Sequence, residues 1–322
     1  QLSAAARALV ALLNEAGHAG ATVEPRVAWH DSTAVDVTFV ATPGDVNRFG
    51  AFDPGPIGDD LAPLARRTSG LRRGDRYSPQ ALARAEENIR RLELFRQIRL
   101  TTRPATAETL DVAGELRLAP LRTLAVTAGY WTDDQVRLGA SWKHRNLLRA
   151  GRGFGAKATY SRFRQDLGLT AWRPAYPGPR SGLSLALDLS RQAEDAYTLR
   201  AATLTATLTW RPTFADALSL SLAGGRQALD VKTDDVLAFR TGDGVFTVLT
   251  GTWSRDTADD RLSPTRGGAW RARAAVTTPG LPSDFRYAVA EAERVRYWPV
   301  GRTVLAGRLG VGWGRPDRKS VV

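Results

Sequence analysis

Few residues of this 322-residue chain have the types and spacing that catalysis requires. Its three histidines, His18, His30 and His144, stand far apart and lack the short spacings of metal ligands. The chain has no cysteine, which excludes disulfides, thiolate zinc sites and a cysteine nucleophile. No local motif places a serine beside a histidine, so a hydrolytic centre would have to be assembled by folding. These residues predict no metal site and no cofactor.

Two short segments carry groups that bind phosphate or transfer protons in other proteins. Gly151–Lys157, GRGFGAK, is rich in glycine, but it lacks the GxxxxGK[ST] spacing of a phosphate-binding loop and opens a predicted strand. Asp256–Asp260, DTADD, holds carboxylates with no partner acid or base around them. Both segments are interpreted as turns, and the sequence predicts that the chain is not an enzyme.

The chain is strongly basic, with a net charge of +12 and a sequence pI near 10.7, which raises the question of nucleic acid. Its arginines are scattered, singly or in adjacent pairs, from Arg7 to Arg318, without a longer basic block, a helix-turn-helix pattern or an RNA-binding aromatic motif. We therefore predict no nucleic-acid partner. No run of about 18 apolar residues occurs, which excludes a transmembrane helix but not membrane strands of about 9–11 residues.

Residues 1–120 alternate helical and strand periodicity. Ser78 is predicted as the N-cap of a helix with Pro79 at its first position. The predicted elements are a helix within 3–20, strands at 22–31 and 34–42, a helix within 77–95, and strands at 96–104 and 109–118. Helix, strand, strand thus occurs twice. We expect two small α+β modules, a partial one at 1–44 and a second at 45–120.

From residue 121 to the end the chain is predicted to form strands only. In Leu204–Trp210, LTATLTW, apolar residues occupy one parity and threonines the other, which indicates a strand with two unlike faces. Turn residues such as those of Ala175–Ser181, AYPGPRS, separate the segments. The predicted strands are 121–131, 134–144, 152–163, 166–173, 182–191, 197–210, 217–231, 244–254, 269–277, 286–298 and 303–313.

Alternation alone does not separate a soluble sandwich from a membrane barrel, since both have one apolar and one polar face. Polar positions made of Ser, Thr and Arg, strands joined in simple succession and the placement of tryptophan favour the barrel. Six tryptophans fall at one edge of the predicted sheet, as rings do at a membrane surface, and we expect them to mark the boundary on the side where residue 120 joins the modules to the first strand. Trp172 and Trp298 fall out of phase with the apolar face, which leaves a sandwich with core tryptophans as the alternative. The four in phase are predicted membrane-interface residues: Trp142, Trp210, Trp253 and Trp270.

Three segments, in this order, resemble one known family. Leu71–Leu100 is similar to a POTRA domain, Trp142–Phe154 resembles the first periplasmic turn, and Arg255–Trp270 resembles the mid-barrel Asp…Pro-Thr-x-Gly turn. The residues that match the POTRA pattern are Leu71, Gly74, Tyr77, Leu82, Ala85, Leu92, Phe95 and Ile98. Over essentially its whole length the chain thus resembles the outer-membrane β-barrel assembly factors with POTRA domains, TamA-like members first and BamA-like members second.

The resemblance implies periplasmic POTRA modules followed by an antiparallel transmembrane barrel of sixteen strands in the bacterial outer-membrane bilayer. Residues 121–322 would supply its N-terminal part, about 11 strands. It implies insertion and folding of β-barrel or autotransporter clients without a nucleotide or active-site chemistry, and a periplasm-spanning TamB-like partner on the POTRA domains. The alternatives are a two-partner secretion pore that exports an unfolded protein through its lumen, and a barrel with a purely structural role.

The sequence departs from the family pattern in two places. Arg149 stands where the family usually has glycine after Arg-Asn-Leu-Leu, so we expect that turn to differ. The last strand runs into GWGRPDRKSVV, residues 312–322, where the family's sixth extracellular loop should begin, and neither its Val-Arg-Gly-Phe motif nor five further strands follow. Because an open sheet edge is not viable in lipid, and because no methionine is present, we expect a fragment of a longer protein.

In this family the first barrel strand pairs weakly with the last, so the resemblance points to Leu121–Trp131 as the site of action. A strand edge offers unpaired N–H and C=O groups to another strand, and a glycine weakens local pairing. The alternative is that this strand only closes the barrel. The expected client-docking residues are Leu124, Val126, Ala128, Gly129 and Tyr130.

A charge pair is predicted for the lumen. Arg271 opposes the parity of Trp270, and Glu291 stands between alanines on the same inward parity. A hairpin centred near Leu281 would bring Arg271 level with Glu291. The alternative is two solvated charges.

Overall fold

The computed structural model describes residues 2–29, 35–132, 135–232, 242–260, 262–278 and 280–316. His30 and the residues after Pro316 lie outside the described residues. The chain divides into two compact units, one of residues 1–120 with 149–151 and one of residues 121–148 with 152–322. Each unit is described by itself.

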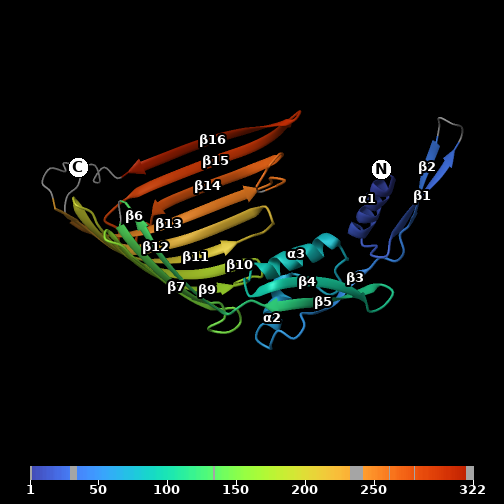
Figure 1. Ribbon diagram of the computed structural model, residues 1–322, viewed down its shortest axis with the longest axis horizontal. Helices are drawn as coiled ribbons and strands as arrows, with labels where there is room; N and C mark the ends of the chain where they lie inside the picture. Colours follow the sequence, from blue (N-terminus) through green and yellow to red (C-terminus); the bar gives the residue numbers. More distant parts are fainter. Residues whose placement is uncertain are drawn as a thin grey trace. The chain divides into compact units, whose positions relative to one another are not determined.

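The first unit begins with a helix that packs on a hairpin (Figure 1). α1 (Leu2–Glu15) contacts β1 (Thr22–Trp29), which pairs antiparallel with β2 (Val35–Thr42). This is the helix–strand–strand order that the sequence predicts. Pairing is in register from Thr22 opposite Thr42 to Trp29 opposite Val35.

The rest of the first unit is a three-stranded sheet with two helices. Its elements are β3 (Arg48–Asp53), α2 (Ala62–Ser69), α3 (Pro79–Arg90), β4 (Phe95–Pro104) and β5 (Thr109–Leu118). The strand order is β3–β5–β4, with β3 parallel and β4 antiparallel to β5. The sequence does not predict β3 or α2, because elements of six and eight residues show too little periodicity.

Apolar residues of α3 and the strands beside it form the core of the first unit. Ala85, Ile89 and Leu94 have no exposed surface, and Val112 on β5 is also buried. Ser78 is the N-cap of α3, as predicted, and its hydroxyl accepts a hydrogen bond from the Ala81 N–H at 3.2 Å. The apolar stripe of α3 therefore faces the core.

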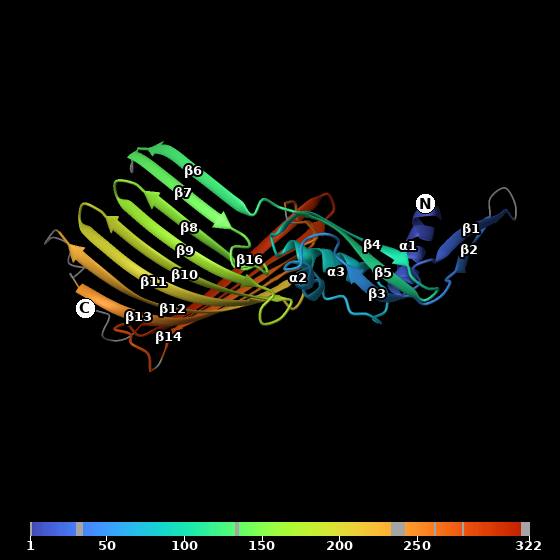
Figure 2. The same ribbon diagram turned by 90° about the horizontal axis from the view of Figure 1, so that it is seen from below.

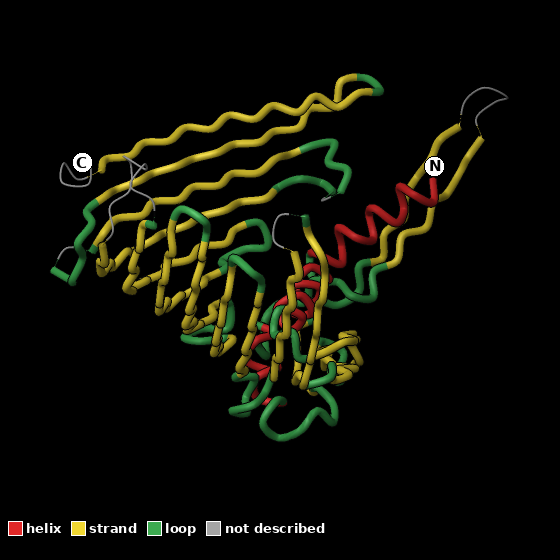
Figure 3. The backbone as a smooth tube through the Cα atoms, turned by 60° about the vertical axis from the view of Figure 1, so that its left-hand side comes forward, coloured by secondary structure: helices red, strands yellow, loops and turns green. Residues whose placement is uncertain are grey.

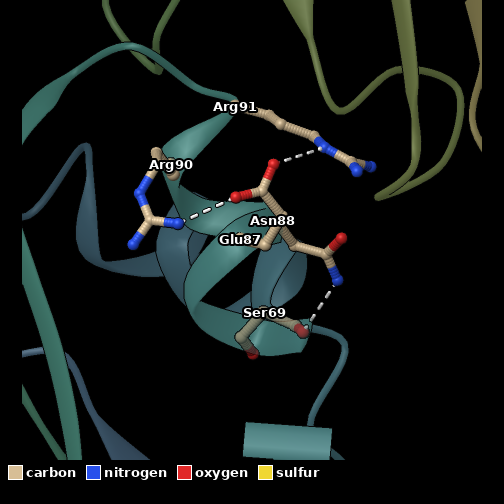
Figure 4. Close-up of polar contacts among 5 residues, drawn as sticks. All are labelled: Ser69, Glu87, Asn88, Arg90 and Arg91. Carbon is tan, nitrogen blue, oxygen red and sulfur yellow. Dashed lines mark hydrogen bonds and ion pairs between the residues drawn. The ribbon is translucent and has the colours of Figure 1, made fainter. Parts of the chain in front are cut away.

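Polar side chains join α3 to the end of α2 (Figure 4). The amide of the buried Asn88 donates to the carbonyl of Ser69 at 3.2 Å, which satisfies one of the last carbonyls of α2. One residue earlier on α3, the Glu87 carboxylate accepts hydrogen bonds from Arg90 at 2.8 Å and from Arg91 at 3.3 Å. Asn88 is thus a buried link between the helices, whereas the ion pairs lie at the surface.

The second unit is one antiparallel sheet of eleven strands, in which strands that follow one another in the chain pair with each other. The sheet is curved (Figure 2), and its strands run side by side between turns at both ends (Figure 3). Number and order agree with the sequence, and the strand ends agree within three residues. The strands are β6 (Arg122–Trp131), β7 (Gln135–His144), β8 (Gly153–Tyr160), β9 (Arg164–Pro174), β10 (Ser181–Ala193), β11 (Tyr197–Trp210), β12 (Asp216–Val231), β13 (Gly242–Asp256), β14 (Gly267–Thr277), β15 (Tyr287–Val300) and β16 (Thr303–Pro316).

The register sorts the side chains of this sheet onto two faces. Leu208 on β11 lies opposite Leu183 on β10 and Leu220 on β12, and directly opposed residues share a face. Carried through every strand pair, the face of Leu208 holds mainly Leu, Ala, Val and Trp, and the face of Thr207 holds mainly Ser, Thr, Gly and charged residues. We call them the apolar face and the polar face.

Candidate functional site

The apolar face is widely exposed. Leu185, Leu204 and Leu220, on three adjoining strands, are 47%, 49% and 50% exposed. A contiguous apolar surface of this extent marks a surface that meets a partner or a membrane. Since it continues from β6 to β16, it fits the outward band of a membrane sheet.

The four predicted membrane-interface tryptophans lie on the apolar face at one edge of the sheet. Trp142 is opposite Leu124, and both Trp210 and Trp253 are opposite Leu218. Trp270 lies on the same face near the start of β14. Each stands within three residues of the strand end at this edge. Amphipathic rings in this position are suited to the boundary between lipid and water.

The remaining two edge tryptophans lie on different faces. Trp172 is on the polar face, as predicted, and its ring lies 5.1 Å from the Lys143 ammonium. The prediction for Trp298 is wrong: this residue shares the parity of Ala290 and lies on the apolar face, opposite Leu305. The apolar face therefore carries five of the six edge tryptophans.

Hydroxyl groups form cross-strand pairs on the polar face. The hydroxyls of Thr207 and Ser221 are 2.9 Å apart, and those of Ser219 and Thr252 are 2.6 Å apart. Such pairs bind each other across the sheet and still leave lone pairs for water. This face is suited to a wet lumen.

The predicted lumen charge pair has a different register. Arg271 lies opposite Glu293, with Nη1 and Oε1 3.2 Å apart, and Arg273 lies opposite Glu291. Arg271 is therefore not level with Glu291. The hairpin between β14 and β15 is centred on Pro282, one residue later than predicted, which shifts the partner by two residues. The Thr247 hydroxyl helps to fix this loop by donating to the Pro282 carbonyl at 2.9 Å.

Glu293 is the centre of a small charge network on the polar face. Besides Arg271, it accepts a hydrogen bond from Arg308 on β16 at 2.5 Å. Gly310 and Gly312 lie opposite Glu293 and Glu291, and their missing side chains help to leave a hollow of about 520 Å³ beside the network. Arg308 is not among the residues predicted for the lumen, although its parity, opposite to that of its neighbours Leu309 and Val311, indicates the polar face.

β6 is an edge strand of the described sheet. It pairs with β7 from Arg122 opposite His144 to Trp131 opposite Gln135, without a bulge. Its apolar-face residues Leu124 and Val126 are more than 70% exposed. Gly129 does not interrupt the ladder. Instead, the Trp131 ring covers it, because a Cβ at Gly129 would lie 2.3 Å from that ring.

The turn between β7 and β8 contains three successive residues with positive φ. Arg149, Ala150 and Gly151 have φ values of 56°, 49° and 73°. Two of them carry a Cβ in the left-handed region, which favours glycine. Arg149 therefore replaces the family's usual glycine at a position where glycine is the easier residue.

The turn between β13 and β14 is organised by Asp259. Its carboxylate accepts hydrogen bonds from the Thr265 hydroxyl at 2.5 Å, from the Thr265 N–H at 2.8 Å and from the Arg266 N–H at 3.0 Å. These hydrogen bonds hold the pKa of Asp259 well below its usual value, and the bond from the Thr265 hydroxyl contributes most. Gly267 has φ +88°, and a Cβ there would lie 2.0 Å from the Thr257 carbonyl oxygen. The carboxylates of this segment thus serve the turn, as predicted.

The described residues contain no group of three or more His, Cys, Asp or Glu side chains that could hold a metal ion. In the same part of the chain, no helix combines the length and the apolar character needed to cross a bilayer.

Several solved structures share this fold. BamA from Haemophilus ducreyi lacking POTRA domains 1-3 matches with a TM-score of 0.67 at 15% identity, covering 98% of this chain and 65% of that chain. CdiB from Escherichia coli matches with a TM-score of 0.57 at 12% identity, covering 98% and 62% of the two chains. CdiB from Acinetobacter baumannii matches with a TM-score of 0.50 at 12% identity, covering 95% of this chain and 58% of that chain. The chain thus spans less than two thirds of each of these proteins. No curated protein matches it in sequence.

A curved antiparallel sheet with one exposed apolar face, one polar face and an edge of tryptophans has the features of a β-sheet protein of the outer membrane. The sequence profile described as the Omp85 superfamily domain matches residues 146–320, more than half of the chain. This chain belongs to the Omp85 superfamily. Its members are membrane insertion or translocation factors of the outer membrane, so the expected superfamily and location are confirmed.

Proposed function

We propose that this chain is part of an outer-membrane factor that inserts and folds β-barrel or autotransporter clients, with β6 as its lateral gate. The observation that carries the proposal is the position of β6, which pairs with β7 alone among the described strands. An edge strand presents a row of unpaired N–H and C=O groups, which another strand can continue. The proposed docking residues are Leu124, Val126, Ala128, Gly129 and Tyr130.

Docking of this kind depends on the backbone of the client. Main-chain hydrogen bonds supply the affinity, and the side chains of the added strand need only suit the two faces. The exposed apolar residues Leu124, Val126 and Tyr130 would continue the apolar face onto a client strand. One edge can therefore accept many clients whose strands alternate in the same way.

Disulfide crosslinking tests this proposal, and the absence of cysteine gives a clean background. Single cysteines at Leu124, Val126 and Ala128 of the full-length protein, stalled with a client, should crosslink to the client's terminal strand. Matched cysteines at Leu138 and Ala140 on β7, one strand in from the edge, should not. Crosslinks only from polar-face positions such as Thr205 and Arg271 would contradict the gate.

We assign the first unit to POTRA domains, a partial one at 1–44 and a second at 45–120, in the periplasm with a TamB-like partner. Residues of the POTRA-like pattern hold structural positions that support this: Ala85, Leu92 and Phe95 are buried, and the Tyr77 ring meets Phe49 edge-on at 5.6 Å. Deletion of residues 1–120 should abolish co-purification with the partner. Partner binding by the remaining sheet would contradict the assignment.

The interface tryptophans are proposed to mark the periplasmic boundary. Lipids brominated near the headgroup should quench their fluorescence, and lipids brominated near the chain ends should not, because the rings lie at the strand ends. Equal quenching at all depths would contradict this position.

A two-partner secretion pore is the second candidate. The polar face favours it, since hydroxyl pairs and the Arg271–Glu293–Arg308 network would line a passage for an unfolded chain. The same crosslinking experiment separates the candidates: a translocating substrate should crosslink to Thr205 and Arg271 rather than to β6.

A further inference from the structure

One row of residues crosses the apolar face at its tryptophan edge. Arg255 on β13 lies opposite Trp270 on β14, and Trp270 lies opposite Arg294 on β15. Because neighbouring strands are about 4.8 Å apart, the two arginines flank a single indole. The guanidinium carbon of Arg294 is 4.5 Å from the centre of the Trp270 ring, a cation–π contact that holds the cation beside the ring.

A third arginine lies closer to the edge of the sheet. Arg296 is exposed, and its guanidinium carbon is 6.0 Å from the centre of the Trp298 ring on the same face. The acidic residue opposite Arg255 is Asp216, whose Oδ2 is 3.8 Å from the Arg255 guanidinium. That carboxylate also accepts a hydrogen bond from the Trp253 indole at 3.2 Å. Asp216 thus pairs with Arg255, whereas Arg294 and Arg296 lie at tryptophan rings, and the three arginines give this edge a positive charge.

A groove lies on the apolar face next to this row, on the side away from the edge of the sheet. This groove of about 620 Å³ has small residues such as Gly251, Ala272 and Ala274 in its lining, with larger side chains such as Trp210 and Trp253 beside them. Trp253 lies opposite Ala272, one step along the strands from Arg255 and Trp270. The groove therefore begins about 7 Å from the arginines.

We propose that this edge binds an anionic membrane phospholipid, with its phosphate at Arg255, Arg294 and Arg296 and one acyl chain in the groove. Guanidinium groups fit phosphate oxygens in pairs, and tryptophan rings lie at the depth of the headgroups. A soluble anion would bind the arginines and leave the groove empty. A phospholipid carries a charged phosphate next to apolar acyl chains, just as the arginines lie next to the apolar groove. The inference rests on contact between the apolar face and lipid.

Native mass spectrometry of the full-length protein with phosphatidylglycerol or phosphatidylcholine of identical acyl chains tests this site. The unaltered protein should retain phosphatidylglycerol more tightly than phosphatidylcholine. Arg294→Gln with Arg296→Gln should weaken it by about tenfold or more, at about fivefold per arginine, and leave phosphatidylcholine unchanged. Ala274→Leu, which fills the groove, should weaken both lipids. Arg296→Gln alone, at an exposed position that folding tolerates, should show a loss of about fivefold.

The matched control is Arg191→Gln with Arg200→Gln. These two arginines lie opposite each other on the apolar face, at the ends of their strands away from the six edge tryptophans, so the control removes the same charge elsewhere. Its phosphatidylglycerol binding should equal that of the unaltered protein.

Equal retention of both lipids by the unaltered protein, or an equal loss in the control variant, would overturn the site. Quenching of tryptophan fluorescence by lipids brominated near the headgroup reports separately on contact between the apolar face and lipid. If that quenching is absent, the lipid contact and this inference fail together. If it is present and phosphatidylglycerol is not preferred, only this inference fails.

Discussion

The two units of this chain use the same apolar residues in opposite ways. In the first unit, Ile89 and Leu94 have no exposed surface, whereas on the large sheet Leu185 and Leu204 are almost half exposed. Both units alternate apolar and polar residues with the period of their elements. The first unit buries its apolar residues between helices and strands, and the sheet leaves its own to the membrane. Periodicity therefore predicts that an element has an apolar face and does not by itself predict whether protein or lipid covers that face.

Truncation of a core residue should have the largest effect. Ile89→Ala removes a fully buried side chain from α3 and should lower the free energy of unfolding of the first unit by about 2–5 kcal/mol. Leu185→Ala on the apolar face should cost less, about 1–2 kcal/mol, since it loses the transfer of methyl groups into lipid but leaves no cavity. Hydrogen exchange at α3 measures the effect of Ile89→Ala, and denaturant unfolding in micelles measures the effect of Leu185→Ala. Similar losses of stability for both variants would contradict the conclusion that the two units place their apolar residues in different surroundings.

A charge on the apolar face should have the next largest effect. Leu185→Arg places a guanidinium against lipid and should reduce the free energy of folding into a bilayer by about 2–4 kcal/mol. The matched control is Ala186→Arg on the same strand, which points to the polar face beside Thr205 and should be tolerated. Reversible refolding into vesicles measures both variants. An equal penalty for both would show that the two faces do not differ in their contact with lipid.

The parts of the chain before and after residue 120 also differ in the residues that adopt positive φ. Among the described residues, residues 1–120 use six glycines and Glu93, whereas the residues after 120 use four glycines together with Gln135, Arg149, Ala150 and Ala175. Ala150→Gly should therefore raise the stability of the sheet by about 1 kcal/mol, because it removes the cost of a Cβ in the left-handed region. Thermal unfolding in micelles measures the change. A loss of stability would contradict left-handed strain in this turn.

Electrostatic coupling on the polar face should be the smallest effect. A double-mutant cycle on Arg271 and Glu293 should give a coupling energy of about 0.5 kcal/mol, since Arg271 is largely exposed. A cycle on Arg271 and Glu291 should give almost none, because these residues are not opposite each other. Refolding free energies of the single and double variants provide the measurement. The reverse order of the two couplings would restore the register predicted from the sequence.

The large sheet was predictable because its strands are long and regular. Each alternates over about ten residues, and turn residues separate the segments, so all eleven are found in order. β3 and α2 were not predictable from period alone, because short elements depend on the tertiary contacts around them. Gly50 on β3, for example, lies against Thr109 and Asp111, far away in the sequence.

The site was predictable in kind and less so in detail. Residue types and parity place the tryptophan edge, and the resemblance to the family predicts the superfamily and its membrane. The pairing of Arg271 depends on the length and anchoring of one hairpin loop, which parity does not reveal. Likewise, the role of Gly129 depends on where the Trp131 ring lies, and β6 as a docking edge stays a prediction.

The succession of strands in the sheet also determines how it can grow. Each inner strand of the sheet pairs with the strands before and after it in the chain, and the edge strands β6 and β16 each pair with one, so every pairing needs only the closure of one hairpin. Local closures of this kind take about 1–10 μs, and a fold made of them needs little search for distant partners. Such a sheet can grow stepwise, by adding one hairpin after another to strands that are already paired. At every stage, the newest strand is the edge that receives the next.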